Sequence, residues 1–299
     1  MTKTTSTANL PGDLADLVSR PPIYHLMCVA EKIRGKHLNH VWKGLAGIPN
    51  GDEPALPVVV KHLPRQSELD IELACGLAAQ VLKLPVPAPA IVVADTDDLP
   101  DHPTSLSAGR VILYGSLFQA SDSFLARNTS SATEAHEHIW SKVCENAVAP
   151  MGAAWDELVA NPDRHAQNFL FDGQKWWLFD HNMALQPLAK MYANLERDST
   201  QRQLIEHTAR VNQIIDQLKQ RRPLDHEVRA EAEKVVKQSK RLKMLAIAMD
   251  KWHVGDKRLD NLIRHSATII NLIALRMEPL SLFIEKRLST PDATSLWDD

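Results

Sequence analysis

The chain has 299 residues, of which 44% are apolar and 24% are charged, the balance of an ordinary globular protein. Its net charge of -3 at pH 7 disfavours nucleic acid and anionic membranes as partners, and apolar stretches such as 269–275 are too short to span a bilayer. Three widely spaced cysteines form no CxxC pair, so we expect no disulfide framework and no Cys-type zinc site, and a cytoplasmic location.

The first part of the chain reads as a lead-in followed by short strands. Residues 1–19 are polar, lack the apolar run of a secretory signal, and predict a short helix near 13–19. The run 57–63 is β-branched and lies between prolines, which predicts a strand. Apolar residues recur with helical spacing over 68–84. The prolines that follow this helix lead into two more predicted strands, at 91–94 and 111–114.

From about residue 133 the pattern becomes helical. Residues 134–147 and 151–159 predict two helices separated at Pro150. A hairpin is predicted next, with strands at 169–171 and 176–179 joined through Asp172-Gly173. Long amphipathic helices are predicted after Pro187, near 189–219, 225–252 and 257–287. We therefore expect an α+β fold with three parts: a lead-in (1–19), a strand-rich part (20–115) and a helix-rich part (116–299).

The loop 161–168, between a predicted helix and the hairpin, carries the sharpest chemical signal. Asp163 and Asn168 have the Asp-x-x-x-x-Asn spacing of kinase catalytic loops, in which a carboxylate faces the acceptor hydroxyl and an amide oxygen reaches Mg²⁺. Asp180 closes the hairpin and would lie beside Asn168, where the two could share a metal. Each residue alone could cap a turn, and His165 alone could be a core residue. Their conjunction favours catalysis, because converging acids need a cation.

The strand-rich part offers the complement of this loop. Lys61 lies on the strand 57–63 and Glu72 on the following helix, and a strand lysine paired with a helix glutamate holds ATP phosphates in kinases. Glu68, one turn away, is a competing partner. An edge-strand lysine and a solvated glutamate are the structural alternatives. A phosphate-covering loop is weakly indicated by Gly35 and Lys36, which match neither the glycine-rich kinase loop nor the Walker A motif.

Three segments carry a resemblance to a known family. They are VVVKHL at 58–63, IELACGLAAQVLKLPVPAPAIVV at 71–93 and NPDRHAQNFLFDGQKWWLFDHNMAL at 161–185. They resemble the HipA-like kinase family, whose members are similar in their core to eukaryotic protein kinases and phosphoinositide kinases. The resemblance runs from about residue 22 to 190. It implies a bilobal protein-kinase-like fold, with a small β-rich N-lobe and a larger, mostly helical C-lobe, and ATP and Mg²⁺ as cofactors.

The resemblance also implies roles for individual residues. Lys61 would contact the ATP phosphates, Asp163 would be the catalytic base, and Asn168 and Asp180 would hold Mg²⁺. Two residues would brace the catalytic loop, Arg164 and His165. The adenine would lie against the connector near 113–117, which contains Leu113, Tyr114 and Ser116. Residues 33–40 contain no Ser or Thr, so the self-phosphorylation of that loop known in some members is not expected. The chain resembles the compact, stand-alone branch, and the antitoxin partner of the toxin branch is not carried over.

We therefore expect a kinase that moves the γ-phosphate of Mg·ATP to a hydroxyl acceptor. Kinship suggests a protein Ser/Thr, and a small molecule is the other choice. One alternative is a pseudokinase or nucleotide-binding interaction module, with the C-terminal helices as a platform for a protein partner. Another is a small-molecule phosphotransferase, but those enzymes usually show His-Gly-Asp where this loop has Asp-Arg-His. The basic run 234–243 is interleaved with acids, which favours a solvated helix face.

Overall fold

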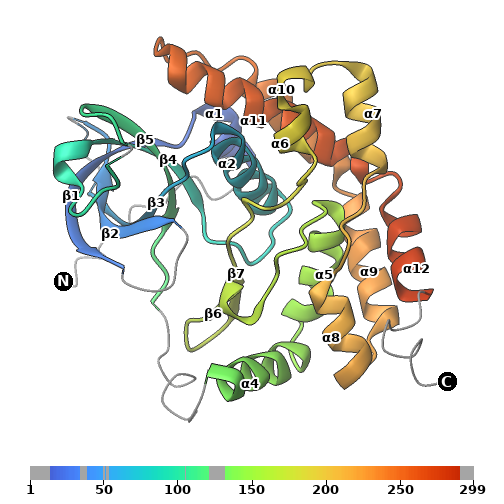
Figure 1. Cartoon of the computed structure of the whole chain (residues 1–299). Coiled ribbons are helices and arrows are strands. Elements are labelled where there is room, and N and C mark those ends of the chain that lie inside the picture. The colour runs from blue at the N-terminus through green and yellow to red at the C-terminus, as the bar shows by residue number, and fades with distance from the viewer. Residues whose placement is uncertain are drawn as a thin grey trace, which may run out of the picture.

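The computed structural model describes residues 14–33, 39–49, 51, 54–104, 106–120 and 132–289, with a β-rich N-terminal part beside a helical C-terminal part (Figure 1). The strands are β1 (Ile23–Lys32), β2 (His40–Gly47), β3 (Leu56–His62), β4 (Pro89–Asp95), β5 (Arg110–Leu117), β6 (Phe169–Phe171) and β7 (Trp176–Leu178). The helices are α1 (Leu14–Ser19), α2 (Gln66–Val81), α4 (Ala132–Cys144), α5 (Val148–Leu158), α6 (Leu188–Met191), α7 (Asp198–Glu206), α8 (Gln213–Arg221), α9 (Asp225–Val236), α10 (Ser239–Met249), α11 (Lys257–Arg276) and α12 (Leu280–Ser289). Short 3-10 turns are η1 (Thr96–Asp98), η2 (Ala166–Asn168) and η3 (Tyr192–Asn194).

The N-terminal strands close into a barrel in the order β1-β2-β3-β5-β4. Neighbouring strands are antiparallel except β1 and β4, whose parallel pairing completes the closure. The sequence predicted β3, β4 and β5 and the structure confirms them. It did not predict β1, β2 or the closure, so the N-terminal part is a barrel rather than only a set of short strands.

Alternation along β3 divides its side chains between two environments. Val58 and Val60 are buried inside the barrel, whereas Lys61 points to the opposite face. In register, Lys61 lies opposite Tyr114 of β5, and Tyr114 belongs to the core shared with the helices. The strand therefore directs Lys61 out of the barrel, toward the helical part.

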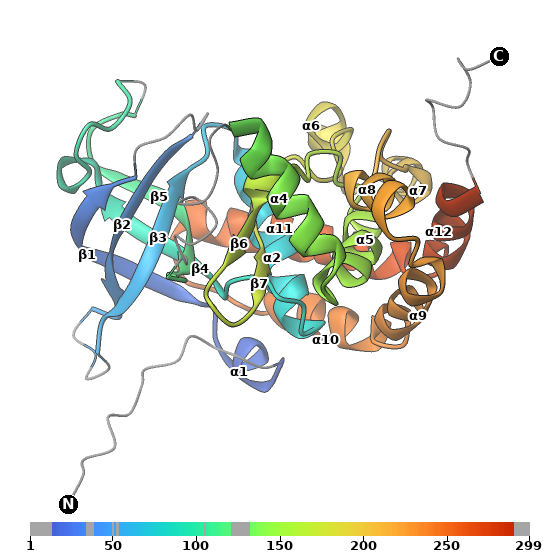
Figure 2. The same cartoon turned by 90° about the horizontal axis from the view of Figure 1, so that it is seen from below.

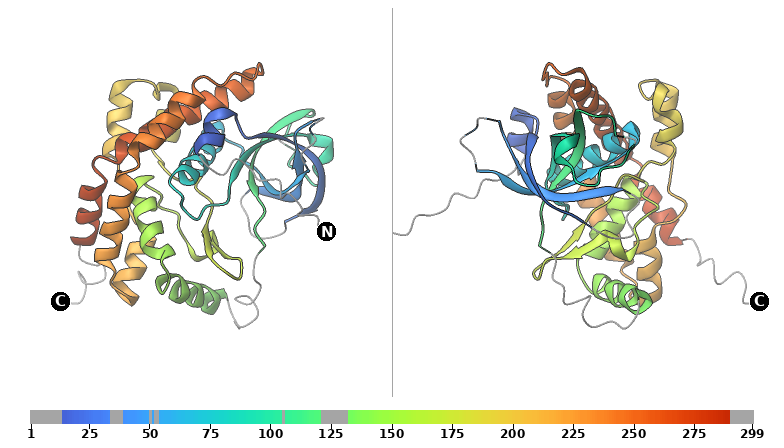
Figure 3. Two further views of the ribbon diagram at one scale, coloured as in Figure 1. Left: turned by 180° about the vertical axis from the view of Figure 1, so that it is seen from behind. Right: turned by 60° about the vertical axis from the view of Figure 1, so that its left-hand side comes forward.

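Helix α2 is the central element between the barrel and the helical part. Most of its residues are buried, including the polar Asp70 and Glu72. It contacts β4 and β5 on the barrel side and α10 and α11 on the other, which the view from behind shows (Figure 3). A helix that is buried nearly all round is a core helix, so its polar residues need internal partners.

The hairpin of β6 and β7 lies between the barrel and α5, with α4 beside it (Figure 2). It was predicted within a residue of its observed bounds. The predicted break at Pro150 is wrong, because Pro150 lies in the first turn of α5, where proline is tolerated. The three long C-terminal helices are also wrong as continuous elements. They are divided into α6 to α8, α9 and α10, and α11 and α12.

No single helix in the described part of the chain is long and apolar enough to cross a membrane. Taken together, α11 and α12 are long and apolar enough to do so, but the two helices are bent by 64° at the break between them.

Candidate active site

The side chain of Lys61 reaches from the barrel to the turn that follows β7. Its Nζ donates to Oδ1 of Asp180 at 2.5 Å and to Oδ1 of Asn182 at 3.3 Å. Burial alone would lower the pKa of Lys61, but the carboxylates of Glu72 and Asp180 outweigh burial and raise it. Lys61 is therefore a charged ammonium held in a largely buried, acidic environment, not an edge-strand lysine in solvent.

Glu72 projects from α2 to the backbone of the same turn. Its Oε2 accepts the N–H of His181 at 2.8 Å, and the residue is 2% exposed. Burial raises the pKa of Glu72 to about 7, although the nearby charge of Lys61 opposes the rise. Glu72 is thus neither on a solvated face nor free to move.

The predicted ion pair between Lys61 and Glu72 is replaced by a different arrangement. Within the described residues, the hydrogen bonds of the Lys61 ammonium go to Asp180 and Asn182, and Glu72 acts on it through the electrostatic field. The competing partner Glu68 lies 3.5 Å from Arg65 instead. The physical reason is that the turn after β7 inserts Asp180 beside the ammonium, and Glu72 is engaged by the turn's backbone.

The loop 161–168 is stabilised by its own side chains. Oδ1 of Asn161 accepts the N–H of Asp163 at 3.1 Å, and Nδ2 of Asn168 donates to the carbonyl of Asp163 at 2.7 Å. The second bond orients the Asn168 amide so that its nitrogen faces the loop and its oxygen is directed away from that bond. Asn168 is also linked to the far strand, because its carbonyl accepts the N–H of Phe179 at 3.3 Å. Asp163, Asn168 and the residue before Asp180 are therefore parts of one bonded unit.

Arg164 is the fully buried brace of this unit. Its guanidinium makes a two-point ion pair with Asp156 of α5, with Nε to Oδ2 at 3.0 Å and Nη2 to Oδ1 at 2.9 Å. Its Nη1 donates to the carbonyls of Asn168 at 3.2 Å and Phe179 at 2.5 Å. One side chain thus connects α5, the loop and the end of the hairpin.

Asp156 is a site residue that the sequence reading missed. Its Oδ1 also accepts from Nδ2 of Asn161 at 3.1 Å, so Asp156 holds the loop at Asn161 as well as at Arg164. The local sequence Trp155-Asp156-Glu157 does not indicate whether Asp156 is buried or lies on the surface. The only available signal was indirect: a buried arginine in the loop would require an acidic partner nearby.

Asp163 itself is half-buried, so its carboxylate keeps access to solvent. Burial raises its pKa, and the neighbouring charge of Asp180 adds to the rise while His165 opposes it. A raised pKa makes this carboxylate a stronger base than an ordinary aspartate. His165 is half-buried beside it, with its backbone N–H donating to the carbonyl of Asp163 at 3.1 Å.

Asp180 occupies a left-handed backbone conformation, with φ of +63°. Such a conformation is uncommon for a residue other than glycine, although aspartate and asparagine tolerate it best. It turns the chain so that the Asp180 carboxylate meets Lys61 while the next N–H meets Glu72. Burial, with the charges of Arg164 and Lys61, lowers the pKa of His181 well below its usual value, so this buried imidazole is neutral.

The residues expected near adenine lie on β5, not in the connector after it. Leu113 is fully buried in the barrel core, and burial raises the pKa of Tyr114 well above its usual value. The side chain of Leu113 packs in the barrel interior, and its contact with a base stays a prediction. Ser116, nearer the end of β5, is half-buried. The phosphate-loop residues Gly35 and Lys36 lie outside the described residues.

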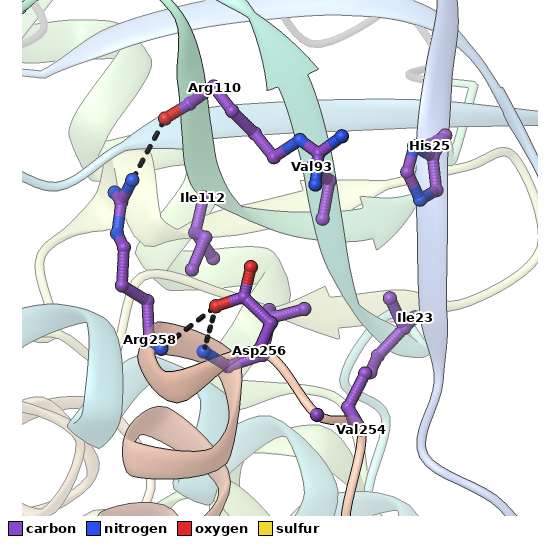
Figure 4. Close-up of a pocket in the computed structure, with 10 residues that line it drawn as sticks. Ile23, His25, Val93, Arg110, Ile112, Val254, Asp256 and Arg258 are labelled. Atoms are coloured by element: carbon purple, nitrogen blue, oxygen red, sulfur yellow. Dashed lines mark hydrogen bonds between the residues drawn. The ribbon is translucent and has the colours of Figure 1, made fainter.

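A separate cavity of about 370 Å³ lies on the outer face of the barrel, against the first turn of α11 (Figure 4). Part of its polar wall is hydrogen-bonded within the protein: Asp256 accepts the N–H groups of Arg258 and Leu259, and the Arg258 guanidinium donates to the carbonyl of Arg110. The described residues that line it include none from the Lys61–Asp180 region. The cavity is therefore distinct from the candidate active site.

Comparison with known proteins adds little to this geometry. No family model matches the chain, and no curated protein matches it. Among solved structures, the crystal structure of a Helicobacter pylori proinflammatory kinase, CtkA, is similar at 13% sequence identity with a TM-score of 0.47, over 86% of this chain and 99% of that one. An identity and a score this low do not establish a shared family or activity.

Proposed function

We propose that this chain is a Mg·ATP-dependent phosphotransferase that moves the γ-phosphate to a hydroxyl acceptor. The observation that carries the proposal is the contact between Lys61 and Asp180 beside the unit formed by Asp163 and Asn168. A cation from the barrel, two acids and an oriented amide converge where kinase chemistry needs them. A scaffold has no need for this set of groups, because converging acids are costly unless a cation compensates them.

The donor atoms of the site fit Mg²⁺. The Asp180 carboxylate and the Asn168 amide oxygen are hard oxygen ligands, and Mg²⁺ is usually held by one or two protein carboxylates together with phosphate oxygens and water. In the described residues no group of three or more His, Cys, Asp or Glu side chains forms a dedicated metal cage. A metal held jointly with a nucleotide, rather than a resident one, is what this donor set suits. When bound, Mg²⁺ would neutralise charge on the phosphates.

The chain's own residues would act as follows. Lys61 would bind phosphate oxygens, exchanging part of its contact with Asp180 for them. Asp163 would accept the proton of the acceptor hydroxyl while the oxygen of that hydroxyl forms a bond to the γ-phosphorus. The bond from that phosphorus to the bridging oxygen breaks, and ADP keeps the electron pair. Arg164, Asp156 and Glu72 would position these groups without touching the reacting atoms.

Calorimetric titration of ATP, with and without Mg²⁺, tests the binding half of the proposal. We compare wild type with Asp180→Asn, which keeps the size and tolerates the left-handed backbone but removes the charge. Asp250→Asn, at an exposed position after α10, is the matched control. We expect Mg²⁺-dependent binding by wild type and the control, and loss of the Mg²⁺ dependence in Asp180→Asn. Absence of ATP binding by wild type in both conditions would refute the proposal.

Phosphate transfer or release by Asp163→Asn tests the chemical half. Removal of a general base typically lowers the rate by about 10²- to 10⁴-fold, and the affinity for Mg·ATP should be retained. If wild type binds ATP but wild type and Asp163→Asn are equally inactive, the chain is a nucleotide-binding interaction module. If wild type transfers phosphate, the acceptor, a protein Ser/Thr or a small alcohol, is identified by following labelled phosphate. The three cysteines are free thiols, which suits the cytoplasmic location that we propose with this activity.

A further inference from the structure

A second polar cluster is built around α2, away from Lys61. Asp70 is fully buried, and its Oδ2 contacts both the hydroxyl of Tyr192 and Nδ1 of His265, the latter at 3.2 Å. The Tyr192 hydroxyl lies 2.7 Å from the same Nδ1, and the two rings meet edge to face with centroids 5.2 Å apart. Gln66 donates to the other oxygen of Asp70 at 2.7 Å. We call Asp70, Tyr192 and His265 the α2 cluster.

Its hydrogen bonds follow from the number of protons available. Tyr192 has one hydroxyl proton, and donating it to Asp70 leaves the hydroxyl oxygen and Asp70 both as acceptors toward His265. With Asp70 ionised, Nδ1 of His265 is the atom that donates a proton to these acceptors. A buried carboxylate is costly without such donors, so each member of the cluster depends on the other two. Replacing one of them leaves Asp70 under-satisfied in the core.

The α2 cluster joins three segments that are distant in sequence. Asp70 is on α2, His265 is on α11, and Tyr192 begins η3, in the segment that leaves the Asp180 turn through α6. Ser266, next to His265, adds a hydrogen bond from its hydroxyl to the backbone carbonyl of Asp70 at 3.3 Å. The segment that follows the proposed metal-binding residue is thus returned to α2 and attached there.

Asp70 and Glu72 attach α2 on two different sides. At about 100° per residue, positions two apart on a helix point about 200° from each other. Glu72 receives the N–H of His181 in the Asp180 turn, while Asp70 receives Tyr192 and His265. The turn and the segment after it are therefore held by a single turn of one helix, from opposite faces.

We infer that Asp70, Tyr192 and His265 are positioning residues that fix α2 and thereby hold Glu72 against the Asp180 turn. The inference deepens the proposed function and rests on it in so far as the Asp180 turn is the metal-binding turn. The coupling between the α2 cluster and the turn is a property of the fold and can be measured without a nucleotide. Loosening the cluster should release the backbone of the turn, whose N–H at His181 depends on Glu72 alone in the bonds described.

Hydrogen exchange of the nucleotide-free whole chain tests the coupling. Tyr192→Phe removes one hydroxyl, and His265→Phe keeps a ring against Tyr192 but removes the donor. We expect amide exchange in 179–182 and in α2 to rise by about tenfold in both variants. Tyr24→Phe, which removes a buried hydroxyl inside the barrel, is the matched control and should leave these amides unchanged. Unchanged exchange in 179–182, or an equal rise in α9, would overturn the inference.

The transfer assay separates this inference from the proposed function. Tyr192→Phe should loosen the Asp180 turn but leave the direct contact between Lys61 and Asp180 in place. We therefore expect kcat to fall by about tenfold while the Kd for Mg·ATP changes by less than about threefold. Raised exchange together with no ATP binding by wild type would refute the phosphotransferase and leave the coupling supported. Normal exchange in an active enzyme would refute the coupling and leave the phosphotransferase standing.

Discussion

Removing the carboxylate of Asp156 should destabilise the chain strongly, because it leaves the Arg164 guanidinium buried with only carbonyl partners. Both side chains of this ion pair are completely buried, and Asp156 accepts two charge-assisted bonds from Arg164 and a third from Asn161. Breaking a buried ion pair from one side costs about 3–5 kcal/mol. We expect the free energy of unfolding of Asp156→Ala to fall by that amount.

Urea unfolding at neutral pH, followed by tryptophan fluorescence and by circular dichroism, measures the effect when the two probes agree. Glu285→Ala is the control: Glu285 makes a comparable two-point pair with Arg229, but both are solvent-exposed, so its midpoint should hardly move. The double variant of Asp156→Ala with Arg164→Leu should lose clearly less than the sum of the two single losses, because the charges are removed together. A midpoint shift no larger than that of Glu285→Ala, or strict additivity, would refute the reasoning.

Two further predictions concern Glu72 and the barrel. The pKa of Glu72 in the folded chain is about 7, above its ordinary value of 4.5, so the folded state holds the extra proton between these values and the contribution of Glu72 to stability falls as pH rises through that range. Urea unfolding near pH 5, 6 and 7 should therefore show Glu72→Gln gaining stability relative to wild type toward pH 7, and parallel curves would contradict this. In Gly44→Ala, the new methyl group on β2 would meet the backbone carbonyl of Cys28 on β1, and we expect a loss of about 1–3 kcal/mol in thermal unfolding. An unchanged Tm would contradict this and show that β1 and β2 move apart to accommodate the methyl group.

The sequence predicted those parts of the fold whose signals are local. The β-branched run of β3, the apolar spacing of α2 and the Asp172-Gly173 turn each lie within a few residues. Strand β1 mixes His25, Glu31 and Lys32 with apolar residues, and its identity as a strand depends on pairing with β2 and β4. That pairing is a long-range property, which periodicity does not report.

The broken C-terminal helices show the same limit. Between α7 and α8 the chain leaves helical geometry where the buried Arg276 of α11 takes the carbonyls of Leu204, Ile205 and His207. No signal near residue 207 announces a partner so distant in sequence. Asn212, in contrast, caps α8 by accepting the N–H of Ile215, and a cap of this kind is a local signal that the sequence does offer.

For the candidate site, spacing linked Asp163 with Asn168, the predicted hairpin added Asp180, and the position on a strand added Lys61; the structure brings these regions together. What spacing could not provide is which partner each group takes. Lys61 was expected to meet Glu72 and meets Asp180, because the left-handed turn at Asp180 is decided by tertiary packing. The brace from Asp156 to Arg164 also arises only when α5 and the loop are folded against each other.

The closure of the barrel has a consequence for the N-terminal region of the chain. Residues 23–25 of β1 pair in parallel with 91–93 of β4, and Ile91 also donates its N–H to the carbonyl of Pro22 at 2.8 Å. Each barrel strand thus has a neighbour on both sides, which denies other molecules an open edge for strand addition. Removing residues 23–25 as well as Pro22 would uncover the backbone of β4 at 91–93 as such an edge. The first strand therefore completes the barrel and covers the backbone of β4 that strand addition would use.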